Sequence, residues 1–108
     1  MINENELMIE VRISLENGCP TNTLVNMIYE ISRMSSRSMV YTRTSITNEC
    51  IKYAAEHAIS NFDKFNPSKQ IFPYFAQIIK SAMGKRYKNL IKVDRRLLKI
   101  KKILEDYS

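Results

Sequence analysis

Hydrophobic residues recur every three or four positions along most of this chain, a spacing that is typical of amphipathic helices. The first such segment covers residues 3–16, and its apolar positions are Leu7, Met8, Val11 and Leu15. Asparagine side chains at positions 3 and 5 suit the start of a helix, and the Asn-Gly pair at 17–18 suits its end. We therefore expect the chain to open with a helix.

Two further segments show the same spacing. The second covers residues 22–41, with Asn22 or Thr23 as the expected cap. After a polar stretch at 42–47, Ser45 or Thr47 is expected to cap a third helix that continues to about Phe62. The apolar face of the third helix is rich in alanine, which lets a neighbouring helix approach closely. Phe62 and Phe65 are expected to pack in the core at the end of this helix.

The pair Asn66-Pro67 interrupts the pattern, because proline lacks an amide hydrogen and the residue before it avoids helical backbone. Ser68 is the expected cap of the next helix, which passes through Ile79 and Ala82. Gly84 is a possible kink before a basic amphipathic segment at about 85–105, since glycine costs about 1 kcal/mol relative to alanine inside a helix. The pattern predicts an all-α fold, a compact bundle of four to five helices in one domain over 1–108.

Composition agrees with this fold class and limits the cellular setting. The chain has 108 residues, 44% of them hydrophobic, which favours one folded domain over disorder. Two glycines and three prolines are few, so few turns are expected. No run of 18 apolar residues occurs, and the first ten residues lack the features of a signal peptide. We therefore expect a cytoplasmic protein.

Charge is distributed unevenly along the chain. Residues 1–30 contain five acidic side chains and one basic one, Arg12, whereas residues 77–102 contain ten basic side chains and one acidic one, Asp94. A solvated helix face normally mixes both signs, so this imbalance favours contact with a polyanion. The basic segment predicts nucleic-acid binding, and the acidic half could face a basic protein.

Three aromatic residues, Phe72, Tyr74 and Phe75, lie one to two turns before the basic segment. They cannot all point inward on a helix, because successive positions differ by about 100°. One interpretation places Phe72 and Phe75 in the core with Tyr74 at the rim. The other has Tyr74, and also Phe75, stacking on an unpaired base, an interaction worth about 1–3 kcal/mol per base.

Enzymatic and metal-dependent functions have little support in the sequence. Glycine-rich phosphate loops and catalytic motifs are absent, and His57 is the only histidine. Cys19 and Cys50 lack metal-ligand spacing and are expected to be reduced thiols. We expect no enzyme activity, no metal and no cofactor.

One stretch of the chain resembles the second conserved region of bacterial sigma factors. Glu49-Cys50-Ile51-Lys52-Tyr53 opens the stretch, Asp63-Lys64-Phe65-Asn66-Pro67 follows, and Phe72-Pro73-Tyr74-Phe75-Ala76 comes next. The chain is also similar to the small late-transcription sigma factors of tailed bacteriophages, which share a Y-x-x-Q pattern matched here by Tyr74 and Gln77. The resemblance covers about residues 3–95, and the motif-like part is 49–83. Phe62-Asp63 is an alternative match for the family's Phe-Asp pair.

The resemblance implies a minimal RNA polymerase sigma factor that recognises and melts a −10-like promoter element in the host cytoplasm. Its partners would be the clamp helices of the largest subunit of core polymerase, promoter DNA with its non-template strand, and a coactivator or second subunit. The implied DNA-binding residues are Tyr74, Phe75, Gln77, Lys80, Lys85, Arg86 and Lys88. The implied polymerase-binding residues are Glu49, Lys52, Tyr53 and Glu56.

The chain departs from the family at two places. Lys52 and Tyr53 replace an acidic or amide pair of the docking helix, and Ile78 and Ile79 replace tandem tryptophans. Two alternatives therefore stay open. One is a polymerase-binding regulator or coactivator that does not melt DNA, and the other is a small sequence-independent nucleic-acid-binding protein.

Overall fold

The computed structural model describes residues 2–39, 44–65 and 70–106, and every element in these ranges is helical. The α-helices are α1 (Glu4–Asn17), α2 (Asn22–Ser35), α3 (Thr44–Ser60) and α4 (Ile71–Asp106), with short 3-10 helices η1 (Ser36–Ser38) and η2 (Phe62–Lys64). The predicted all-α bundle is confirmed. The expected turn at Asn66-Pro67 and the Ser68 cap lie outside the described residues.

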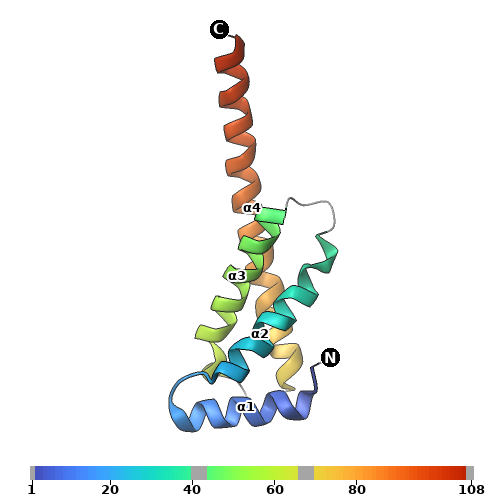
Figure 1. Ribbon diagram of the computed structural model, residues 1–108, viewed down its shortest axis with the longest axis vertical. Coiled ribbons are helices and arrows are strands. Elements are labelled where there is room, and N and C mark those ends of the chain that lie inside the picture. The colour runs from blue at the N-terminus through green and yellow to red at the C-terminus, as the bar shows by residue number, and fades with distance from the viewer. Residues whose placement is uncertain (1, 40–43, 66–69, 107–108) are drawn as a thin grey trace.

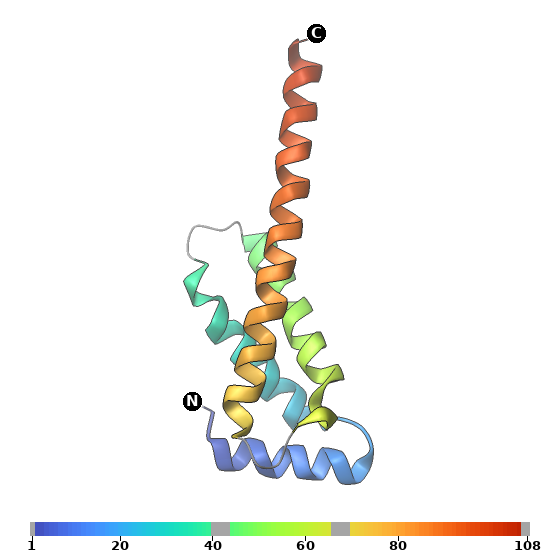
Figure 2. The same cartoon turned by 180° about the vertical axis from the view of Figure 1, so that it is seen from behind.

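The helices form a bundle from which α4 protrudes (Figure 1). α1 lies across one end, α3 runs antiparallel to α2 and α4, and the C-terminal half of α4 extends well beyond the other helices (Figure 2). The molecule therefore measures 61 by 25 by 23 Å. A helix of 36 residues spans about 54 Å at 1.5 Å per residue, so α4 accounts for most of this length.

The core is built from one face of each α-helix. α4 packs most extensively against α3, and α2 packs against both. Three buried alanines of α3 leave room for larger side chains from its neighbours. The buried apolar residues of α4 recur with helical spacing and are Ile71, Phe75, Ile79, Ala82 and Met83. Phe62 is also buried and Phe65 packs against the core, as the sequence predicted.

A hydrogen-bond network joins α1 to α2. The Thr21 hydroxyl accepts from the Leu24 amide at 3.1 Å and donates to Glu10 Oε2 at 2.9 Å. The Thr21 amide donates to the hydroxyl of buried Ser14 at 3.0 Å. Thr21 is thus the cap of α2, and the prediction of Asn22 or Thr23 was wrong because the residue pointing back at the helix is one position earlier.

Other predicted boundaries also shift. Asn3 caps α1 as predicted, accepting from the Asn5 amide at 2.8 Å, and Gly18 ends it with a positive φ of 75°. α2 ends at Ser35 rather than near 41, and α3 already begins at Thr44, so neither Ser45 nor Thr47 is its cap. Gly84, expected as a possible kink, does not divide the last helix, since α4 is a single helix from Ile71 to Asp106.

We predict that Thr21→Ala lowers the free energy of unfolding by about 1–2 kcal/mol, because the helix loses its cap and Glu10 loses a donor. Thr23→Ala is the matched control, because Thr23 is exposed in the first turn of the same helix. Urea unfolding followed by circular dichroism measures both. Equal losses in the two variants would contradict the assignment of the cap.

Candidate nucleic-acid interface

Tyr74 lies where the end of α3, η2 and the first turn of α4 meet. Its hydroxyl donates to the Asn61 carbonyl at 2.7 Å, and its ring makes edge contacts with Phe65 and Phe75 at centroid distances of 5.6 and 5.3 Å. Burial, and then the negative charge of Asp63, raises the pKa of the Tyr74 phenol above its ordinary value of 10.0. Tyr74 is half-buried and lines two surface pockets, so part of its side chain is accessible.

The position of Phe75 contradicts its predicted role in stacking on a base. Its side chain is fully buried between Ile71 and Ile79 on the core face of α4. It cannot stack on a base without leaving the core, so the interpretation that placed Phe75 inside and Tyr74 at the rim is the one the structure supports. Helical phase explains the difference, because position 75 shares a face with 71 and 79 whereas 74 lies about 100° away.

Gln77 is exposed, and together with Tyr74 it lines two shallow pockets. One, of about 350 Å³, is lined by His57, Tyr74, Gln77, Ile78 and Ser81. The other, of about 310 Å³, is lined by Gln70, Pro73, Tyr74 and Gln77. The structure therefore brings the Y-x-x-Q pair together at an accessible surface, where an aromatic edge and an amide can contact a ligand.

Arg86, predicted to bind DNA, contacts two residues that were predicted to bind polymerase. Its Nη2 lies 3.0 Å from Glu49 Oε1, and its guanidinium carbon lies 5.6 Å from the centroid of the Tyr53 ring. The Tyr53 ring in turn stacks on His57 with a 10° angle between the planes. These contacts join the N-terminal half of α3 to α4 at the point where α4 leaves the bundle. The assignment of Arg86, Glu49 and Tyr53 to external partners stays a prediction.

The remaining predicted residues are exposed. Lys52 and Glu56 lie on α3, and Lys80, Lys85 and Lys88 lie on α4. Beyond these, exposed bases continue along α4 at alternating intervals of three and four residues. This set, here called the basic stripe, is Lys85, Lys88, Lys92, Arg95, Lys99 and Lys102. At about 100° per residue its members follow one side of the helix, over a length of about 26 Å.

The last four members of the basic stripe belong to the segment 77–102 that predicted nucleic-acid binding, but they were not among the individually named DNA-binding residues. Their 3–4 spacing was a signal that could have found them, since it continues unbroken from Lys85 to Lys102. The acidic side chains Glu4, Glu6 and Glu16 are exposed on α1, at the opposite end of the molecule from the tip of α4 (Figure 1). This separation gives the protein one strongly cationic end, and a surface of this charge is complementary to a polyanion.

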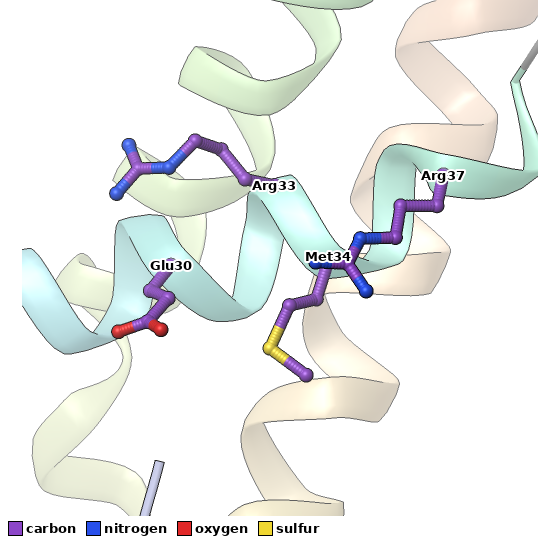
Figure 3. A pocket seen from close by; sticks show the side chains of 4 residues that line it. All are labelled: Glu30, Arg33, Met34 and Arg37. Carbon is purple, nitrogen blue, oxygen red and sulfur yellow. The ribbon is translucent and has the colours of Figure 1, made fainter. Parts of the chain in front are cut away.

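A second cationic site was missed from the sequence. Glu30, Arg33, Met34 and Arg37 line an open pocket of about 620 Å³ on α2 and η1 (Figure 3). Arg33 and Arg37 lie one turn apart, a spacing visible in the sequence but not singled out there. The pocket lies on a different helix from the basic stripe.

Metal and membrane features are absent from the described parts of the chain. Within residues 2–39, 44–65 and 70–106, no group of three or more His, Cys, Asp or Glu side chains could hold a metal ion. None of the helices in the same ranges is long and apolar enough to cross a membrane. Cys19 is exposed and Cys50 is buried, and both are free thiols.

Comparisons with known proteins assign no family. No protein-family model matches the chain, and neither curated proteins nor solved structures give a significant match. The functional argument therefore depends on the residues and their geometry.

We predict that Tyr74→Phe lowers the free energy of unfolding by about 0.5–1.5 kcal/mol at neutral pH, because the Asn61 carbonyl loses its donor. Tyr87→Phe, on the exposed part of α4, is the control and should have little effect. The raised pKa of Tyr74 also predicts how its contribution to stability changes at alkaline pH. The stabilising contribution of the Tyr74 hydroxyl is complete below the pKa that this phenol has in the unfolded chain. It disappears as pH rises through the pKa that the phenol has in the folded protein. Urea unfolding from pH 7 to alkaline pH measures both effects, and identical losses in the two variants would contradict the prediction.

We predict a small favourable coupling between Glu49 and Arg86, below about 1 kcal/mol, because both side chains remain partly exposed. A double-mutant cycle of Glu49→Gln and Arg86→Gln, measured by urea unfolding at low and high salt, determines it. The coupling should shrink at high salt. A coupling that is zero at low salt would show that the ion pair does not hold α4 against α3.

Proposed function

We propose that this protein is a minimal sigma-type transcription factor that docks on core RNA polymerase through α3 and holds promoter DNA with α4. The observation that carries the proposal is the basic stripe. It follows, on the same helix, the segment that resembles the second region of sigma factors. A helix fits the major groove of a duplex, and regularly spaced lysines can contact successive phosphates.

The arrangement of α3 and α4 supports separate surfaces for the two partners. Lys52 and Glu56 are exposed on α3 and available to a protein, whereas the basic stripe extends away from the bundle. Tyr74 and Gln77 lie on the same helix as the basic stripe, before its first lysine. A flipped base of the non-template strand could stack on the accessible part of the Tyr74 ring and contact the Gln77 amide.

The proposal extends to the setting that the family resemblance implies. The protein would direct late transcription of a bacteriophage in the host cytoplasm, together with a coactivator or second subunit. It would act without enzymatic chemistry of its own and without a cofactor. Each of these statements depends on the resemblance at 49–83.

Sequence-independent binding of nucleic acid is the second candidate. The burial of Phe75 and the hydrogen bond of the Tyr74 hydroxyl favour it, because both reduce the aromatic surface available for capturing a base. In this case the basic stripe alone would supply the affinity. A polymerase-binding regulator that does not melt DNA is consistent with the same two observations.

We predict that Lys88→Ala, Lys92→Ala and Lys99→Ala together abolish promoter-dependent transcription while leaving binding to core polymerase intact. The three lysines are exposed, so the fold should persist. Lys52→Glu with Glu56→Lys is the complementary variant, which should weaken binding to core polymerase and leave the basic stripe unchanged. Pull-down with a bacterial core polymerase and run-off transcription from a fully double-stranded AT-rich promoter measure the two steps.

The outcomes separate the candidate functions. Absence of binding to core polymerase, with tight binding of the free chain to oligonucleotides of any sequence, would replace the sigma proposal with the second candidate. In that case each lost phosphate contact should reduce the slope of log affinity against log salt by about 0.9. Binding to core polymerase with transcription unaffected by Tyr74→Ala would indicate a regulator that does not open DNA.

A further inference from the structure

The protruding half of α4 carries exposed apolar side chains as well as bases. Val93, Ile100 and Leu104 are 52%, 54% and 64% exposed, and Leu90 is half-buried against the core. These four residues, here called the apolar stripe, are separated by intervals of three, seven and four, which fit the a and d positions of a heptad. The heptad position between Val93 and Ile100 is also apolar in the sequence, where it is Leu97.

The apolar stripe continues the core-facing side of α4. Counting about 100° per residue, it lies in line with Phe75, Ile79 and Met83, and roughly opposite the basic stripe. α3 covers this side of α4 within the bundle, but α3 begins at Thr44, and the rest of α4 extends past it (Figure 2). Among the described residues, no element lies over Val93, Ile100 or Leu104. A core-facing surface thus continues into solvent, which is typical of an interaction site.

The width of the apolar stripe and the charge of this half of α4 indicate what kind of partner binds there. Val93, Ile100 and Leu104 follow the narrow a and d seam of a helix-to-helix contact, and Ile103 is an exposed apolar residue beside that seam. The apolar face of a helix that lies on a membrane is wider.

Residues 85–106 contain nine basic and three acidic side chains. Six of the bases form the basic stripe on the other side of α4, and the e and g positions beside the apolar stripe hold Arg96 and Lys101 with Asp94. A second copy of this helix would bring the same positive excess alongside, whereas a helix with acidic flanks would neutralise it.

We infer that the apolar stripe of α4 binds an amphipathic helix of a partner protein whose apolar seam is flanked by glutamate or aspartate. The partner helix would extend the bundle by taking, beyond Thr44, the place that α3 occupies within it. The basic stripe lies on the other side of α4 and stays free for nucleic acid. The inference therefore does not depend on the proposed function, since a partner helix could bind whether or not α4 contacts DNA.

The test uses the full chain and a synthetic helical peptide of about four heptads, with leucine and isoleucine at a and d and glutamate at e and g. A second peptide carries lysine at e and g instead. Fluorescence anisotropy with labelled peptides should show binding of the glutamate peptide at least about tenfold tighter than that of the lysine peptide. Repulsion between glutamates keeps the probe from pairing with itself.

The chain offers a matched pair of variants. Ile100 and Ile103 are both 54% exposed and lie three positions apart on α4, but only Ile100 belongs to the apolar stripe. Ile100→Ser should weaken binding of the glutamate peptide by about tenfold, and Ile103→Ser by less than about twofold. Both side chains are remote from the core, so circular dichroism should show unchanged helix content. Binding of a DNA oligonucleotide should be unaffected by either variant.

Several results would overturn the inference. Equal loss in the two variants, equal affinity for the two peptides, or no binding of the glutamate peptide would each remove its basis. Self-association in analytical ultracentrifugation that Ile100→Ser abolishes would show that a second copy covers the apolar stripe. Sedimentation with phosphatidylserine vesicles that depends on Ile100 would assign the apolar stripe to a lipid surface.

Discussion

The packing of one face of α4 against α3 is the constraint on which the rest of the structure depends. Ala54, Ala55 and Ala58 keep the buried face of α3 small, so that side chains as large as Phe75 fit into the core. This contact sets the rotation of α4 about its own axis. It therefore decides which residues of the protruding half lie in line with the core and which lie on the opposite side.

Two stripes with different chemistry follow from that rotation. The basic stripe lies on the side of α4 away from the bundle, where its ammonium and guanidinium groups are exposed to water. The apolar stripe lies in line with the core and loses its cover where α3 begins. The ion pair of Arg86 with Glu49, beside the Tyr53 ring, lies at the end of the bundle. One helix thus contributes to the core and carries both the surface proposed to bind nucleic acid and the surface proposed to bind a protein.

The helical pattern predicted the fold class well, because burial of apolar faces at 3.6-residue spacing dominates the energetics of a small domain. The sequence predicted the wrong residue where a single hydrogen bond determines the start of a helix. Thr21 rather than Asn22 or Thr23 caps α2, since its hydroxyl also donates to Glu10 and its amide donates to Ser14, both residues of α1 that lie outside the local sequence. The helix continues through Gly84, which the sequence suggested only as a possible kink, because packing of Met83 and the residues before it outweighs a propensity cost of about 1 kcal/mol.

The sequence by itself determined that the chain is helical, that one end is strongly basic, and that three aromatic residues precede the basic segment. Only the tertiary structure decided that Phe75 is core and Tyr74 is rim, because that depends on which side of α4 meets α3. It also decided that Arg86 contacts residues of α3, 33 and 37 positions away. Spacing along a chain specifies the relative phase of side chains on a helix. The absolute orientation of those side chains is fixed only when another helix covers one face.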